Sequence, residues 1–550
     1  MSETPNSIYK KKFLFDLEFQ YLLIFIFTFS LILRFSYGFF INGDLYVWSY
    51  GTVNQGLMRT TSRIIENIFH SKYSFLNSYL FSSIFFALGI TLNTFLGLNL
   101  FKKISGSVYF SILYLISIRF SPAGFQIFHN IHTVNSWEQY FFSLFAPLCL
   151  LYSDYISEFK NPKKLIYYSF AITIIILGIF YREFTFIEMF SLLLILSLTT
   201  KTKIDKYIFS SLTIFSALIA YFSLYSPANI VTRAIIDFTN ISQIFIQQTD
   251  LYFITSFILG LLIISLYLFK KNKSLLLFFL PIFLLSTIFS ILRFSTLLIF
   301  IFIGLKIVSS LLIKNYRKIT FYSILTILLS LYGLSTIRSS SGHFLHLLIP
   351  LFVLDSIQIN FLLKDKMSKF KNLIFFILTF NAFIIFSLSI NGFIQTSKVL
   401  NVINQVSNKL GHISEDLIKE NIDNSNDQKV FPLYGNPYYL NDIGIKSKSF
   451  DSQRCSNNFL SKRNQDKGVL LIHDPSFDCS IFKNNLSEYK KISSFSFDIN
   501  HFLPGYFFAN LYSYKYSGYT PDEWVTTFPL DLRKNKNIVK YKLDIYLPKD

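Results

Sequence analysis

The stretch FFINGDLYVW, residues 39–48, marks the point where the first long apolar run of the chain ends and an acidic residue follows it. This run comes after three lysines at 10–12, and no small-residue cleavage site follows it, which predicts a retained membrane span. The lysines predict a cytoplasmic N-terminus. Asp44 then lies just outside the membrane, where a carboxylate stays ionised at modest cost. A Gly-Asp turn that only ends the helix is the alternative interpretation.

Composition assigns the whole chain to the membrane class. Of its 550 residues, 52% are hydrophobic, and the mean hydropathy of +0.44 is too high for an ordinary water-soluble domain. The net charge of +19 could indicate a nucleic-acid partner. The lysines and arginines, however, occur in short clusters between apolar runs, which is typical of cytoplasmic loops. The composition therefore predicts a polytopic membrane protein that does not bind nucleic acid.

The spacing of these basic clusters predicts the number of spans. Two apolar runs separate each cluster from the next, and a single run, near 75–98, precedes the first cluster. Counting a first span before Asp44 and a last span near 373–393, we expect about 13 spans and a C-terminus outside the cytoplasm. The clusters are Lys102-Lys103, 160–164, 201–206, 270–273, 314–318 and 364–371.

A change in composition near Thr396 divides the chain into a membrane domain, 1–395, and an extracytoplasmic α/β domain, 396–550. The second domain is richer in Asn, Asp, Ser and Lys. Its patterns predict helices at 402–422 and 477–489 and strands at 429–434 and 468–473. Cys455 and Cys479 fall in this domain and could form a disulfide outside the cytoplasm, whereas Cys149 is expected to pack in an apolar run.

The first predicted outer loop contains a second candidate. Apolar residues recur at helical spacing over 53–69, beside Arg59 and Arg63, which predicts a helix on the membrane surface. The two arginines are four residues apart and share a face. They can bind a phosphate or contact anionic lipid headgroups, and the pattern leaves both interpretations open.

Glu138 begins the fourth predicted span. Its place at a helix start suits capping, with Asn135 or Ser136 as the cap, as well as catalysis, and both interpretations stay open. His129 and His132 nearby have the spacing of a metal pair. No third ligand is close in the sequence, so an interfacial loop is favoured over a metal site.

Cations recur in the other predicted outer loops, against the usual charge bias. Arg182 and Glu183 stand between the fifth and sixth spans, in what must be a very short turn. In one interpretation, Arg182 and Glu183 extend toward water and partly neutralise each other. In the other, Arg182 binds a phosphate. The remaining members of this set are Arg293, Arg338, His343 and His346, of which the two histidines can share one helical face.

The order of these motifs resembles that in GT-C glycosyltransferases, most closely the branch with the protein O-mannosyltransferases and the lipid A aminoarabinose transferase. The resemblance rests on Asp44 after span one, Ser136-Trp137-Glu138 at span four, Tyr181-Arg182-Glu183-Phe184 before span six and the stretch 338–346 before Pro350. It covers nearly all of the membrane domain. The fold that it implies has about 13 transmembrane helices followed by an extracytoplasmic α/β domain.

The resemblance implies transfer of a sugar from a polyprenyl-phosphate carrier to an acceptor hydroxyl at the outer face, with inversion. Asp44 and Glu138 would be the catalytic carboxylates, with Asp44 as the general base. The cations Arg59, Arg182, Arg293, Arg338, His343 and His346 would bind the donor phosphate. The acceptor would be a lipid, a glycan or a protein, and the expected location is the inner membrane of a bacterium.

One departure from these relatives concerns metal binding. Many of them carry two adjacent acidic residues in the first loop, whereas Asp44 stands between Gly43 and Leu45. This argues against a metal-binding acidic pair, and we predict no metal site and no required cofactor. A divalent cation stays open as an alternative.

Two other functions fit parts of the pattern. An O-antigen polymerase or ligase also uses outer Arg and His residues, but it would place them in one large loop rather than several short ones. A transporter or flippase of lipid-linked glycans would require similar halves and polar residues deep within spans. The sequence pattern predicts neither feature, which favours the transferase.

Overall fold

The computed structural model describes helices in the first 390 residues and strands from residue 429 onward. The described residues are 20–32, 59–62, 64–65, 79–121, 137–153, 162–224, 296–336, 345–364, 372, 374–387, 390, 429–432, 468–474, 489–500, 506–508, 524–526 and 538–548.

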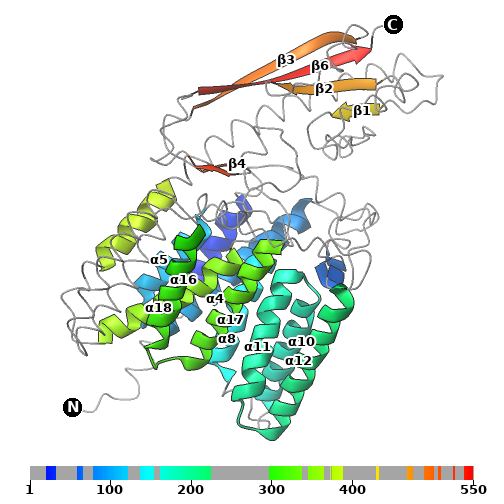
Figure 1. Cartoon of the computed structure of the whole chain (residues 1–550). Helices are drawn as coiled ribbons and strands as arrows, with labels where there is room; N and C mark the ends of the chain where they lie inside the picture. Colours follow the sequence, from blue (N-terminus) through cyan, green and yellow to red (C-terminus); the bar gives the residue numbers. More distant parts are fainter. Residues whose placement is uncertain are drawn as a thin grey trace.

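The helices pack side by side as a bundle (Figure 1). They are α4 (Tyr79–Ser105), α5 (Val108–Arg119), η2 (Trp137–Phe142, a π-helix), α8 (Ser143–Leu151), α10 (Pro162–Ile179), α11 (Glu183–Thr199), α12 (Lys203–Leu224), α16 (Thr296–Leu311), α17 (Arg317–Thr336) and α18 (Leu345–Lys364). Two further apolar helices occupy Gln20–Ile32 and Ile374–Ser387.

Three of the described helices are long and apolar enough to cross a membrane: Ser83–Ser105, Lys203–Phe222 and Leu345–Leu363. Shorter apolar helices accompany them. These features fit a helical membrane protein, as the composition predicts. The count of 13 spans depends in part on residues outside the described ranges, including the basic cluster at 270–273.

Basic turns gather at one end of this bundle, which we call the lysine end. The Tyr316 hydroxyl, between α16 and α17, donates to the Lys103 carbonyl at the end of α4 (3.0 Å). Near the end of α18, the Asn360 amide donates to the neighbouring Ile104 carbonyl. The tight turn from α4 to α5 uses Gly106, whose φ of +74° favours glycine. Turns that are basic in sequence therefore meet in space.

α18 lies at the centre of the bundle and α12 at its edge. The span Leu345–Leu363 is 94% buried, whereas Lys203–Phe222 is 22% buried. α18 packs against α4, α5, α8, α16 and α17. α12 instead exposes large apolar side chains such as Tyr207 and Phe222. An exposed apolar face of this kind is stable in contact with lipid.

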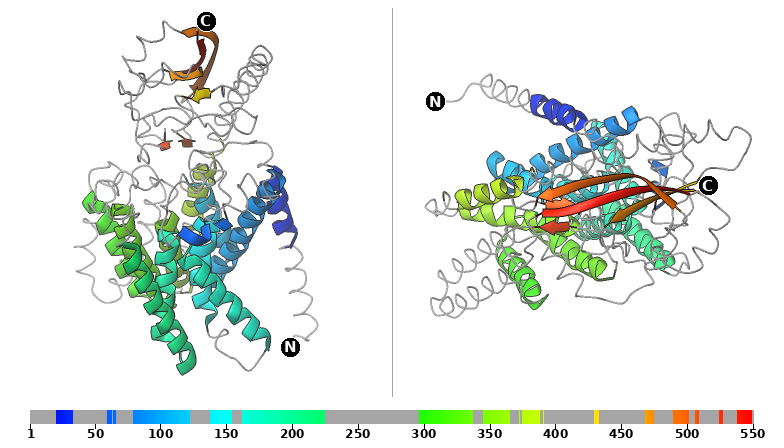
Figure 2. Two further views of the ribbon diagram at one scale, coloured as in Figure 1. Left: turned by 90° about the vertical axis from the view of Figure 1, so that its right-hand side faces the viewer. Right: turned by 90° about the horizontal axis from the view of Figure 1, so that it is seen from above.

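The C-terminal strands form a mixed sheet at one end of the bundle (Figures 1 and 2). Its strands are β1 (Lys429–Pro432), β2 (Gly468–Asp474), β3 (Tyr489–Asn500) and β6 (Ile538–Pro548), in the order β1-β2-β6-β3. β1 is parallel to β2, with Lys429 opposite Gly468, and the other pairs are antiparallel. A separate pair joins β4 (Tyr506–Phe508) to β5 (Trp524–Thr526).

These strands confirm both strand predictions, 429–434 and 468–473, to within two residues. The parallel β1–β2 pair requires a crossover connection, which is a feature of α/β domains. The predicted helix at 402–422 lies outside the described residues. So does the predicted helix at 477–489, except for its last residue, Tyr489, which begins β3.

Candidate functional site

Two segments far apart in sequence meet at the start of α11. The Arg59 Nε donates to the Glu183 Oε1 at 2.7 Å, across a separation of 124 residues. The backbone N–H of Thr61 donates to the Phe180 carbonyl at 3.0 Å, which fixes the same segment to the α10–α11 turn. The predicted outer-loop helix and the predicted short turn are therefore neighbours, which neither pattern indicated.

This turn is as short as its apolar flanks predict. Three residues, 180–182, join α10 to α11. The Arg182 N–H donates to the Thr185 Oγ1 at 2.9 Å, and that hydroxyl donates back to the Arg182 carbonyl at 2.8 Å. Glu183 in the first turn complements the positive end of the helix dipole. These local contacts therefore fix Arg182 and Glu183 at the start of α11.

Two guanidinium groups act on one carboxylate in this cluster. Burial alone would raise the pKa of Glu183, but the Arg59 guanidinium, with a smaller contribution from Arg182, lowers that pKa below its usual value. Both guanidinium groups therefore favour the ionised form of the Glu183 carboxyl. The Arg59 and Glu183 side chains are 23% and 18% exposed, so neither is fully buried. Such a cluster can bind an anion.

The cluster lies opposite the lysine end. α11 runs 17 residues from Glu183 to Thr199, about 25 Å of helix rise, and Lys201 follows immediately. We call the Glu183 end of α11, with Arg59 and Arg182, the Arg59 end.

A second polar cluster lies inside the bundle below this end. The His346 Nδ1 is 2.9 Å from the Glu188 Oε1 and 3.2 Å from the Ser143 Oγ. The Ser143 hydroxyl donates to the same Glu188 oxygen. Phe184 stacks on the His346 ring, with centroids 5.0 Å apart and planes at 10°. Ser143, Glu188 and His346 are all buried, and they come from α8, α11 and α18.

Serine, histidine and glutamate together are the residue types of a nucleophilic triad, but their geometry excludes that chemistry. In a triad the histidine uses one ring nitrogen for the nucleophile and the other for the acid. Here both Ser143 and Glu188 contact Nδ1 of His346. The hydroxyl also donates to the carboxylate rather than to the ring. The cluster therefore joins three helices, and Ser143 is not an activated nucleophile.

The structure describes three of the eight predicted site residues with their side chains. Arg59 and Arg182 lie together at the Arg59 end. His346 is the second residue of α18 and is fully buried against Glu188, which favours a packing role over direct contact with a phosphate. Asp44, Arg293, Arg338 and His343 lie outside the described residues, and of Glu138 only the backbone is described, in η2.

The π-helix at Glu138 was not predicted. The sequence indicates an ordinary capped helix start, whereas Trp137–Phe142 forms wider turns before α8 begins at Ser143. Trp137 donates from Nε1 to the Phe85 carbonyl at 3.2 Å and stacks on the Phe85 ring, with centroids 4.7 Å apart. π-turns are frequent at functional sites, so Glu138 stays a candidate.

The expectation that no polar residues lie deep within spans was wrong. Glu188 in α11, Lys306 in α16 and Asp355 in α18 are each at most 2% exposed. They are single charges within apolar runs, whereas the sequence analysis considered the charges near the ends of the predicted spans. Their signal in the sequence is a polar partner three or four residues along the same helix: Ser309 and Ser310 after Lys306, and Gln358 after Asp355.

Candidate metal ligands are sparse in the part of the chain that the structure describes. Among those residues, no three His, Cys, Asp or Glu side chains are grouped so that they could hold a metal ion. Cys149 is buried in α8, as its apolar surroundings predict.

Comparison with known proteins adds no assignment to this geometry. No family model, no curated protein and no solved structure matches the chain.

Proposed function

We propose that the protein is a GT-C-type glycosyltransferase that moves a sugar from a polyprenyl-phosphate carrier to an acceptor hydroxyl. The observation that carries this proposal is the meeting of Arg59 and Arg182 at Glu183, opposite the lysine end. Two arginines from distant segments meet in a partly exposed cluster. A cluster of this kind at a membrane surface suits a lipid-borne phosphate.

In the proposed reaction, Asp44 accepts the proton of the acceptor hydroxyl as its oxygen attacks the anomeric carbon. The bond from that carbon to the phosphate oxygen breaks, and polyprenyl phosphate leaves with the bonding electrons. Arg59 and Arg182 offset the negative charge that grows on the departing phosphate. A positioned general base typically contributes about 10²- to 10⁴-fold in rate. Glu138 is the second candidate carboxylate.

The proposed topology follows from the same assignment. The lysine end would face the cytoplasm, and the Arg59 end and domain 396–550 would face the other side of a bacterial inner membrane. About 13 spans would then place the C-terminus outside. Cysteine labelling from each side of the membrane tests this: labelling of Lys201→Cys from the outer side alone would reverse the orientation.

The decisive experiment compares wild-type protein with Asp44→Asn on a panel of polyprenyl-phosphate sugars. We expect wild type to release polyprenyl phosphate with at least one donor, and the variant to bind that donor without turnover. Turnover by Asp44→Asn would remove the general-base assignment. Failure of both proteins to bind any such lipid would remove the substrate class.

The phosphate site is tested separately by donor affinity. Arg59→Ala and Arg182→Ala should each raise the Kd for the donor. Arg317→Ala is the matched control, because Arg317 is an exposed arginine at the lysine end. Unchanged affinity in both test variants would dismiss the proposed phosphate site.

A transporter or flippase of lipid-linked glycans is a second candidate, and one observation favours it. A buried charge such as Glu188 in α11 is what a transport pathway requires. Proteoliposomes that hold a fluorescent lipid-linked sugar test this function. Movement of the lipid between leaflets without release of polyprenyl phosphate would replace the transferase with the transporter.

A further inference from the structure

Lys306 is a lysine placed where lysines are rarely found. It lies five residues before the end of α16, about 7 Å of helix rise, and its side chain is 1% exposed. A lysine this close to a helix end normally extends its ammonium group to water. Lys306 instead directs that group inward, toward α18.

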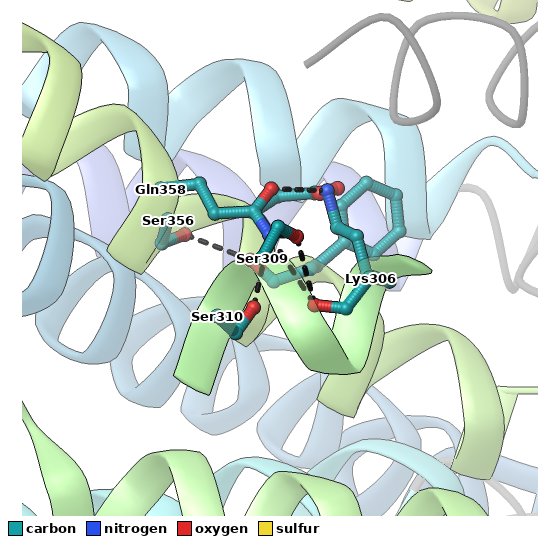
Figure 3. A network of polar contacts seen from close by, with 7 residues as sticks. Lys306, Ser309, Ser310, Ser356 and Gln358 are labelled. Atoms are coloured by element: carbon teal, nitrogen blue, oxygen red, sulfur yellow. Dashed lines mark hydrogen bonds and ion pairs between the residues drawn. The ribbon is translucent and has the colours of Figure 1, made fainter. Parts of the chain in front are cut away.

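The ammonium group meets a matched set of partners on α18. The Lys306 Nζ forms an ion pair with the Asp355 Oδ1 and donates to the Gln358 Oε1 at 2.5 Å. The Gln358 Nε2 then donates back to α16, to the Ser309 Oγ at 2.7 Å and the Ser310 Oγ at 2.9 Å (Figure 3).

The spacing makes this contact specific to one register. On α16 the partners are residues i, i+3 and i+4, and on α18 they are i and i+3, so each set occupies one helical face. A slip of one turn moves a helix by about 5.4 Å. That distance would break every one of these contacts at once.

The cluster is also complete. Among the buried polar atoms without a hydrogen-bond partner, none belongs to Lys306, Asp355, Gln358, Ser309 or Ser310. Each amide end of Gln358 is engaged, and the two charges cancel. A transport pathway or ligand site needs groups that can exchange partners, whereas here the chain itself supplies all of them.

We propose that Lys306, Asp355 and Gln358 form a register clamp that fixes α16 on α18. The central helix α18 then has one allowed position against α16. This role is independent of the proposed transferase activity. It predicts that the two charges are required only as a pair, because removal of one leaves the other buried and uncompensated.

The test compares Lys306→Met, Asp355→Asn and the double variant K306M/D355N in the full chain. The readout is the amount of monodisperse protein extracted from membranes, together with its Tm. We expect each single change to lower both, with a several-fold loss of monodisperse protein. The double change should restore most of that loss. Ser356→Ala is the comparison variant. Ser356 is buried beside Asp355, and its hydroxyl donates within α18 to the Phe352 carbonyl (2.9 Å) and interacts with Tyr114 on α5, so we expect a smaller loss than for either charge.

Single variants that fold like wild type would overturn the clamp. So would a double variant no better than the singles. Normal folding with lost turnover or transport would instead make the pair part of a working site.

Discussion

Two buried polar clusters share α18 and differ in how completely they are satisfied. The Lys306 clamp, between α16 and α18, leaves no polar atom of its members without a partner. The Glu188 cluster, between α8, α11 and α18, leaves the Glu188 Oε2 without a hydrogen bond among the described residues. Both occur in an apolar bundle where unpaired charge is costly. The Lys306 clamp is therefore a fully paired contact, and the Glu188 cluster is a partly paired one.

Their positions match this difference. His346 and Asp355 are nine residues apart on α18, about 13 Å along its axis. The incomplete cluster lies toward the Arg59 end, where the proposed donor phosphate binds. The clamp lies toward the lysine end, remote from that chemistry. The fully paired contact and the partly paired one therefore lie toward opposite ends of one helix.

The largest effect should come from breaking the clamp. Lys306→Met leaves the Asp355 carboxylate buried without its cation and should lower the free energy of unfolding by about 3–5 kcal/mol. A double-mutant cycle with Asp355→Asn, measured by reversible unfolding in mixed micelles, should give a coupling of similar size. A coupling near zero would erase the distinction between the two clusters.

Glu188 should be less sensitive to loss of its charge. Glu188→Gln keeps an oxygen to accept from Ser143 and His346, so we expect a loss of about 1 kcal/mol, whereas Glu188→Ala should cost about 2–3 kcal/mol. The same unfolding assay separates the two variants. If Gln costs as much as Ala, the charge itself is essential and the Glu188 cluster resembles the clamp.

Deleting one hydroxyl from each cluster gives a matched comparison. Ser310→Ala removes a 2.9 Å acceptor of the Gln358 amide and leaves the Ser309 hydroxyl and the longer contact with the Lys306 carbonyl (3.5 Å), and should cost about 1–2 kcal/mol. Ser143→Ala removes one donor from a Glu188 oxygen that keeps His346, and should cost about 0.5–1 kcal/mol. The reverse order would show that the complete cluster adapts more readily.

A loss of stability as small as that of Ser143→Ala is expected at the Arg59 end. Arg59→Ala breaks a partly exposed ion pair and should cost about 0.5–1 kcal/mol at neutral pH. Because the pKa of Glu183 is lower in the folded protein than in the unfolded chain, this contribution is present at neutral pH and is lost as the pH falls through that lowered value. The difference between wild type and Arg59→Ala should therefore shrink on acidification. If the difference in stability between wild type and Arg59→Ala does not change with pH, the Arg59 side chain stabilises the fold by packing and not by its ion pair.

The sequence predicted those features of the fold that depend on residues close together in the chain. Basic clusters such as Lys102-Lys103 predicted which turns share the lysine end, because the positive-inside rule assigns each turn from its own charges. The three-residue turn before Glu183 follows from apolar residues on both sides. Strands β1 and β2 follow from short apolar runs between polar segments. In each case the residues that determine the feature are neighbours in the chain.

The site depends on contacts that one sequence does not encode locally. The Arg59–Glu183 ion pair joins residues 124 positions apart, and no periodicity connects them. His346 could be placed at a helix start, but its burial depends on Phe184 and Glu188 from α11. Lys306 was not predicted as a buried charge, because a single lysine in an apolar run does not reveal that Asp355 lies opposite it. Long-range pairing therefore limited the prediction more than local structure did.

The clamp also has a consequence for the order of events during synthesis. Gln358 follows Lys306 by 52 residues, which a ribosome adds in roughly 3–10 s. For most of that interval α16 has been synthesised while Asp355 and Gln358 have not. The paired contact can therefore form only after α18 has been made, and the final position of α16 depends on a helix that is synthesised later.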